Sequence, residues 1–238
     1  MIEINKFTKF VNIAQKNVDK SRFTMKLYRF ISKYISYIFV HIGITPNQIT
    51  ITHSLLELFG LLILASGNYN YYYYAIVLLV LGGILDNVDG EVARFTKNFS
   101  TAGYYLDYIF HRIIHPLFYL SLSIGIYQNI NSITIIYFGV IASIGYIVSE
   151  ISTNVYKHIL FDKGVKADTM NDDTTNKINT RIIWWNFTIF CFDHMKVGLL
   201  LLTVFNKPEL LIYFYTPLLV LRAIYAVFIN YKKLKIIF

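Results

Sequence analysis

The stretch "DNVDGEVARFTKNFSTAGYYLDYIFHR", from Asp86 to Arg112, concentrates charge between long apolar runs. Asp86 and Asp89 are three residues apart, and Asp107 and His111 are four apart, so each pair shares one face if its segment is helical. Charged groups are costly in an apolar environment, and neighbouring carboxylates repel one another unless a cation lies between them. The stretch therefore predicts a tight helical hairpin that brings the two faces together around a cation.

The composition of the chain is that of a membrane protein. Of its 238 residues, 55% are hydrophobic and only 15% are charged, and the mean hydropathy is +0.49. A soluble domain has about 25% charged residues. The single cysteine, Cys191, excludes an internal disulfide framework.

The net charge of +8 would suit a nucleic-acid partner, but its distribution indicates a membrane surface instead. Eight of the 22 lysines and arginines lie within the first 33 residues, and the others form groups that apolar segments separate. Such groups are typical of cytoplasmic loops that face anionic lipid. We therefore expect the lipid bilayer as a partner, and no nucleic acid.

Six segments are long and apolar enough to cross a membrane, which takes about 20 residues. They are Ile49–Ser66, Tyr71–Val92, Tyr104–Tyr127, Ile133–Tyr156, Trp184–Phe205 and Leu210–Tyr231. The connections between them alternate between basic stretches and stretches with little positive charge. This alternation places both termini and the long loop Lys157–Ile183 in the cytoplasm.

The N-terminal region has a different pattern, because basic residues are dispersed among apolar ones from Phe7 to Val40. This pattern is typical of an amphipathic helix that lies on the membrane surface. The expected fold is thus an all-α integral membrane protein in two parts: an interfacial helix region, 1–45, and six transmembrane helices, 46–238. The polar stretch Val165–Thr180 is expected to be a mobile loop.

The residues around the aspartates favour a phosphate-handling site. Oxygen-rich clusters suit Mg²⁺, Mn²⁺ or Ca²⁺, and Mg²⁺ in particular binds a few carboxylates together with substrate phosphates. Gly90 and Ala93 let a ligand approach the backbone, Arg94 can contact a phosphate with two nitrogens, and Ser100 can donate a hydrogen bond. For any one of these residues, a structural salt bridge or packing role at a helix end is the simpler interpretation. The whole set in this register favours a site.

The segment reads D-x2-D-G-x2-A-R-x8-G-x3-D-x3-H, and this pattern resembles the signature of the CDP-alcohol phosphotransferases. Seven of the eight fixed positions match, and the eighth, a fourth aspartate in the family, is His111 here. A second element, "TPNQIT" (Thr45–Thr50), resembles the family segment just before the first span. The combination is far more specific than a lone glycine-rich pattern.

The resemblance implies six transmembrane helices behind an interfacial helix, a homodimer, and a polar cavity open to the cytoplasm at the inner (cytoplasmic) membrane. It implies transfer of a phospho-alcohol from a CDP-alcohol donor to an acceptor alcohol, with release of CMP and with one or two Mg²⁺ or Mn²⁺ ions. By position, the metal ligands would be Asp86, Asp89, Asp107 and, if it binds through nitrogen, His111. The CDP-binding residues would be Asn47, Gln48, Ile49, Thr50, Gly90, Arg94 and Ser100.

The histidine at the fourth signature position leaves three interpretations open. His111 can be the general base, because the ordinary histidine pKa of about 6.5 suits proton abstraction near neutral pH. It can be a nitrogen ligand that shifts the metal preference from Mg²⁺ toward Mn²⁺. Alternatively, the chain has lost one metal and its activity, and is a CDP-binding relative without turnover.

Other charged residues in the apolar segments also suggest roles. His115, one turn beyond His111, can orient that ring through a hydrogen bond or simply face a polar cavity. Arg112, Lys196 and Arg222 can form an anion pocket for an acceptor phosphate, and structural pairing is an equally good interpretation for each. His53 and Glu57 on the first span are charged residues without an assigned role.

The motif leaves the substrates open. The donor can be CDP-diacylglycerol with a polar acceptor, or a small CDP-linked headgroup with a lipid or polyol acceptor. A small cation transporter that uses the three aspartates is the alternative from another class, but the sequence shows no repeat symmetry that would favour it.

Overall fold

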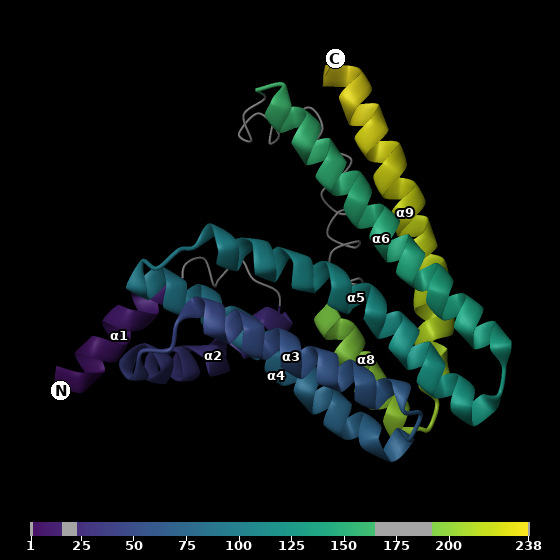
Figure 1. Cartoon of the computed structure of the whole chain (residues 1–238), viewed down its shortest axis with the longest axis horizontal. Helices are drawn as coiled ribbons and strands as arrows, with labels where there is room; N and C mark the ends of the chain where they lie inside the picture. The colour runs from purple at the N-terminus through teal and green to yellow at the C-terminus, as the bar shows by residue number, and fades with distance from the viewer. Residues whose placement is uncertain (1, 16–22, 165–191, 238) are drawn as a thin grey trace. The chain divides into compact units, whose positions relative to one another are not determined.

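The computed structural model describes residues 2–15, 23–164 and 192–237, and the elements in these ranges are all helices (Figure 1). They are α1 (Ile2–Ala14), α2 (Phe23–Ile42), α3 (Pro46–Ala65), α4 (Tyr69–Thr96), α5 (Thr101–Ile130), α6 (Ile133–Asp162), α8 (Phe192–Val204) and α9 (Glu209–Ile237). The chain forms two compact units, Met1–Ile114 and His115–Phe238.

Local signals in the sequence set the ends of the helices in the first unit. Thr45 caps α3 with a reciprocal pair of hydrogen bonds to Gln48, and Pro46 occupies the first turn, where it needs no backbone donor. Asn68 caps α4 through its side-chain oxygen. Lys97 ends α4 in the left-handed conformation, at a φ of 56°. Only four residues, 97–100, separate α4 from α5, so the short connection of the predicted hairpin is confirmed. Close packing of α4, however, is with α3 and α2.

The core of the first unit is the antiparallel pair α3 and α4, with α2 and α1 packed against α4 (Figure 1). Two glycines let the pair approach closely. A side chain at Gly60 would lie 3.1 Å from both the Ala75 carbonyl oxygen and Leu79, and one at Gly82 would overlap Glu57. Small residues at helix contacts are characteristic of membrane proteins, where packing rather than water drives helix association.

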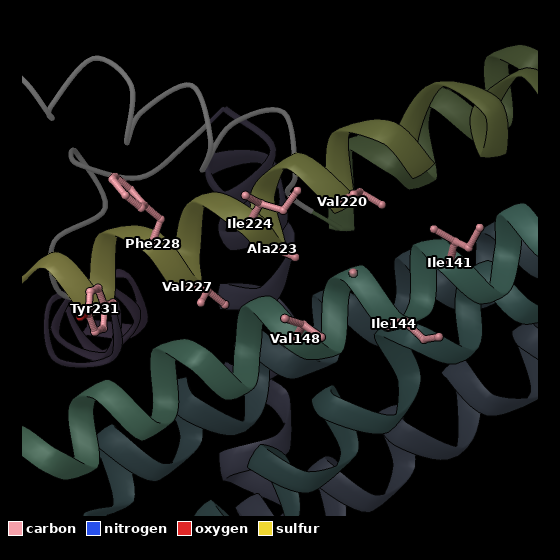
Figure 2. A pocket seen from close by; sticks show the side chains of 10 residues that line it. Ile141, Ile144, Val148, Val220, Ala223, Ile224, Val227, Phe228 and Tyr231 are labelled. Atoms are coloured by element: carbon pink, nitrogen blue, oxygen red, sulfur yellow. The ribbon is translucent and has the colours of Figure 1, made fainter.

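The second unit is built on α6 and α9, which lie side by side, and α8 contacts α9. Gly145 brings the backbones of α6 and α9 together, because a Cβ there would lie 3.1 Å from the Leu219 carbonyl. At this point the two helices border a groove of about 590 Å³. Its lining, shown in Figure 2, is aliphatic and aromatic, from Ile141 to Val148 on α6 and from Val220 to Tyr231 on α9. Such a surface suits hydrocarbon.

The membrane character of the fold is visible in its exposed side chains. Ile51, Leu55, Phe59 and Leu62 form one stripe along α3, and each is between 44% and 66% exposed. An exposed apolar stripe on a helix of this length suits contact with lipid or with another protein. Among the residues that the structure describes, four helices are long and apolar enough to cross a bilayer, namely α3, α5, α6 and α9.

Most of the expected spans correspond to helices. The expected spans one to four and the sixth coincide with α3, α4, α5, α6 and α9. The 28-residue α4 is long enough to cross but starts with tyrosines and carries four charged residues in its second half. The described part of the fifth span is α8, which has 13 residues. Its expected start at Trp184 and the expected mobile loop Val165–Thr180 lie outside the described residues.

The N-terminal region contains two helices where the sequence predicts one. The expected interfacial helix Phe7–Val40 corresponds to α1, which ends at Ala14, and α2, which begins at Phe23. Because both helices pack against α4, they belong to the same compact unit as the aspartate cluster.

Candidate metal and nucleotide site

Three aspartates from two helices meet in the first unit. Asp86 and Asp89 come from α4 and Asp107 comes from α5, and an oxygen of each lies within 4.8 Å of the others. The Nε2 atom of His111 lies 3.0 Å from Asp86 Oδ1 and 3.1 Å from Asp107 Oδ1. The two predicted helix faces therefore do meet, and His111 bridges them.

The fourth residue of the cluster is His53 on α3. Its pattern in the sequence indicates no particular role. Its ring offers a nitrogen within the same 4.8 Å group, and Nε2 lies 3.5 Å from Asp89 Oδ2 and 4.0 Å from Asp107 Oδ1. The side chain is only 1% exposed. The sequence places His53 on the helix face of Thr50, three residues earlier, but does not place that face beside the aspartates.

The cluster has a closed end and an open end. His53 and Asp89 are 1% and 14% exposed, whereas Asp86, Asp107 and His111 are each about one-third exposed. Thr50 donates a hydrogen bond of 2.7 Å to Asp89 Oδ2 and thereby orients the more buried carboxylate. A ligand can thus reach the open end while the closed end holds fixed donor atoms.

These residues fit a divalent cation. Three carboxylates at such short range repel one another, and a cation among them removes that repulsion. Both ring nitrogens of His53 are buried, and no group in the described part of the chain forms a hydrogen bond with either. Carboxylate oxygens and an imidazole nitrogen are ordinary ligands of Mn²⁺, and the carboxylates alone suit Mg²⁺.

The expected nucleotide-binding residues near the starts of α3 and α5 form one hydrogen-bonded group. Asn47 Nδ2 donates to Ser100 Oγ at 3.2 Å, and Ser100 Oγ accepts the Gly103 amide at 2.8 Å. Gln48 and Ile49 have structural contacts instead: Gln48 caps α3, and Ile49 packs in the core with Val88 and Val92.

Gly103 is expected to set the affinity for the nucleotide, because an added Cβ would overlap Asn47 and approach Ser100 Oγ to 3.1 Å. Gly103→Ala should therefore raise KM for the CDP-alcohol about tenfold, the value of roughly one hydrogen bond, and change kcat less. Gly198→Ala is the matched control, since its Cβ would meet only Leu211, at 3.7 Å. Equal KM values for Gly103→Ala and Gly198→Ala would show that Asn47 does not contribute to nucleotide binding.

Arg94 is held in place by the N-terminal region. Its Nε donates a 2.6 Å hydrogen bond to the carbonyl of Ala14, at the C-terminal end of α1, where a cation also complements the helix dipole. The other end of the guanidinium lies over Gly90, where a Cβ would be 3.1 Å from Nη1. Glycine at position 90 thus leaves room for the arginine, as well as for the ligand that the sequence suggested.

Glu91 connects the same region to α4 from inside the fold. This carboxylate is fully buried and accepts hydrogen bonds from Gln15 at 2.6 Å, Ser32 at 2.7 Å and Ser36 at 2.5 Å. Ser32 and Ser36 are one turn apart on α2 and are themselves fully buried. Glu91 therefore fixes α2 and the end of α1 next to Arg94, a role that the sequence alone did not suggest.

Glu91→Ala is expected to lower the free energy of unfolding in detergent by about 3 kcal/mol, because three buried donors lose their acceptor. Glu91→Gln keeps one acceptor oxygen and should cost less. Glu209→Ala, which removes a pair with Lys207 at 3.7 Å, is the matched control and should cost under about 1 kcal/mol. Denaturation curves of the purified variants give these values, and equal losses for Glu91→Ala and Glu209→Ala would contradict the structural role of Glu91.

Comparison with known proteins decides the family. Residues 43–230 match the family model described as CDP-alcohol phosphatidyltransferase. The chain belongs to this family. It is also similar to the archaetidylinositol phosphate synthase of Pyrococcus horikoshii, with 33% identity over 88 residues. That match covers 35% of this chain and 43% of the relative, so the chain spans less than half of the length of that relative.

CDP-alcohol phosphatidyltransferases are membrane transferases of phospholipid synthesis that use a divalent metal, and the resemblance to this family is thereby confirmed. The three signature aspartates of this member lie together, as a metal site requires. Its departure at the fourth position places the His111 ring between two of them.

The residues of the expected anion pocket fall into both units. In the first unit, Arg112 donates to the Tyr108 carbonyl at 3.1 Å and lies over the Tyr108 ring. In the second, Arg222 pairs with Glu150 at 3.1 Å, and Lys196 is 1% exposed. The anion pocket remains a prediction.

His115, for which a hydrogen bond to His111 is one of two interpretations, belongs to the second unit. Its Nδ1 lies 2.5 Å from the Tyr146 hydroxyl. The role of His115 in orienting His111 also remains a prediction.

Proposed function

We propose that this family member transfers a phospho-alcohol from a CDP-alcohol to the hydroxyl of an acceptor and releases CMP. The observation that carries the proposal is the meeting of Asp86, Asp89 and Asp107 within 4.8 Å at a partly open end of the first unit. Family membership supports the reaction class. The number of metal ions, one or two, and the choice between Mg²⁺ and Mn²⁺ belong to the proposal.

The reaction has a simple balance of bonds. The acceptor oxygen bonds to the phosphorus that carries the alcohol, the bond from that phosphorus to the oxygen of CMP breaks, and CMP leaves with the bonding electrons. Asp86, Asp89 and Asp107 would hold a divalent ion, which would supply charge to neutralise the pyrophosphate and to polarise the attacked phosphorus. Arg94 and the Asn47–Ser100 pair position the CDP part of the donor.

The acceptor hydroxyl must lose its proton, and we assign this proton to Nε2 of His111. Asp86 and Asp107 lie within 3.1 Å of that atom, so they can accept the N–H bond that forms and stabilise the imidazolium. His111 thus takes the place of the fourth aspartate of the family.

The membrane arrangement is also part of the proposal. Six transmembrane helices in residues 46–238, an interfacial region in residues 1–45, and cytoplasmic termini fit the four apolar helices, the length of α4, and the basic N-terminus. The protein would lie in the inner membrane as a homodimer and receive its substrates from the cytoplasmic side. Labelling of single introduced cysteines from each side of the membrane tests the orientation.

The substitution of histidine at the signature position supports one competing function, a relative that binds CDP without turnover. Release of CMP separates the two. The experiment uses purified protein with Mg²⁺ or Mn²⁺ and two substrate sets: CDP-diacylglycerol with polar alcohols, and small CDP-alcohols with lipid acceptors. Metal-dependent CMP release that requires an acceptor supports the transferase and identifies the donor class. Binding of CDP without release in either set would establish the competing function.

A further inference from the structure

The cluster contains two histidines, but only one of them is arranged to bind a metal ion. His111 Nε2 lies at hydrogen-bond distance from two carboxylate oxygens, at 3.0 Å and 3.1 Å. The Nε2 atom of His111 is not among the four donor atoms that lie within 4.8 Å of one another. The proposed function uses the lone pair of this atom to take the proton of the acceptor, so it is not used to bind a metal ion.

His53 has the opposite arrangement. Its Nε2 lies 3.5 Å from Asp89 Oδ2 and 4.0 Å from Asp107 Oδ1, beyond an ordinary hydrogen bond. Ligand atoms that share one ion at about 2.1 Å are separated by about 3 to 4.2 Å, for neighbouring and opposite positions respectively. The separations of His53 Nε2 from Asp89 and Asp107 fall inside this interval. The whole group of four donor atoms lies within 4.8 Å, slightly wider than the interval.

The burial of His53 adds an independent argument. The His53 imidazole is 1% exposed, and its contact with Asp89, at 3.5 Å, is longer than an ordinary hydrogen bond. Coordination of a metal through Nε2 would give that nitrogen a closer partner.

We infer that His53 is the nitrogen ligand of the metal, together with the carboxylates of Asp86, Asp89 and Asp107, and that His111 stays outside the ligand set. This inference rests on the proposed function only in that the cluster holds a divalent ion. A site with one imidazole and three carboxylates prefers Mn²⁺ over Mg²⁺ more strongly than a site with carboxylates alone, because nitrogen ligands suit the transition metal better.

The test measures the ligand atoms directly. The purified protein is loaded with Mn²⁺, and the electron spin echo of the ion is recorded for the unchanged chain and for His53→Gln, His111→Gln and His158→Gln. His158 is the matched control, since it is exposed on α6 and pairs with Asp162. We expect ¹⁴N modulation in the unchanged chain, its loss in His53→Gln, and its retention in the other two variants.

Metal affinity provides the second readout. His53→Gln should weaken Mn²⁺ binding at least tenfold, since loss of even an outer partner of a ligand costs about ten- to a hundredfold. It should weaken Mg²⁺ binding less, so the preference for Mn²⁺ falls. His53→Asn is made in parallel, and elution of each variant as a folded species in detergent shows that the fold is intact.

The outcomes distinguish this inference from the proposed function. Loss of the ¹⁴N signal in His111→Gln rather than His53→Gln would overturn the inference and make His111 the ligand. The inference would also be wrong if the ¹⁴N signal stayed unchanged in both His53→Gln and His111→Gln, or if no protein gave a ¹⁴N signal. An equal loss of Mn²⁺ and Mg²⁺ affinity in His53→Gln would contradict it as well. None of these results concerns CMP release, which is measured separately and alone decides the proposed function.

Discussion

Replacing Asp89 with asparagine is expected to lower the rate of CMP release about a thousandfold. The Asp89 carboxylate belongs to the group of donor atoms within 4.8 Å, accepts a hydrogen bond from Thr50, and faces His53. Asparagine keeps the shape but removes the charge that holds the cation, and metal catalysis contributes several kcal/mol to such reactions. The fall should appear in kcat at saturating donor and should be accompanied by weaker Mn²⁺ binding.

Asp162→Asn provides the control for this experiment. Asp162 lies at the end of α6, is more than half exposed, and pairs with His158 at 2.8 Å, so the same chemical change there should leave CMP release unchanged. An Asp89→Asn protein that keeps more than a tenth of the activity would show that the cation is not held by this carboxylate. A loss of activity with unchanged Mn²⁺ affinity would assign Asp89 a positioning role.

The sequence was enough to predict the meeting of the aspartates because helical spacing fixes the face on which each one lies. Intervals of three and four residues align Asp86 with Asp89 and Asp107 with His111 before any packing is known. A connection of four residues between the helices then keeps the two faces close to each other. Because unpaired charge is costly in an apolar environment, the carboxylates are then expected to meet around a cation. Each step depends only on the spacing of residues along the chain.

The position of His53 could not be predicted in the same way. A helix that is apolar on all sides has no hydrophobic face to tell which side meets its neighbour. The contact of Gly82 with Glu57 turns one face of α3 toward α4, and His53, four residues before Glu57, then lies beside Asp89. This register follows from close packing at glycines, so it appears only in three dimensions.

The contacts of Arg94 with the N-terminal region could not be predicted from the sequence either. From its place in the signature, the arginine is expected to contact the CDP part of the donor, and the structure adds a hydrogen bond to the Ala14 carbonyl, 80 residues earlier in the chain. That contact depends on where the end of α1 packs, and the buried Glu91 holds this end through the hydrogen bond from Gln15. Sequence spacing carries no information about partners at such separations.

His111→Ala is expected to reduce kcat by between about a hundredfold and ten-thousandfold, the usual contribution of a positioned base, with little change in KM for the donor. The side chain is 31% exposed, so its removal leaves a space beside Asp86 and Asp107 that a small solute can enter. Added imidazole should therefore restore part of the activity. His111→Asp should retain much more activity than His111→Ala, because it restores the acid that other family members have.

The three variants together separate the interpretations of this histidine. A base predicts a loss in kcat, rescue by imidazole, and unchanged Mn²⁺ affinity, whereas a metal ligand predicts a loss in affinity that imidazole restores together with the activity. If the unchanged chain released no CMP and His111→Asp did, the histidine would be the reason that this family member lacks catalysis. Each case follows from what Nε2 does between the two carboxylates: it takes a proton, binds the metal, or occupies the place of the lost acid.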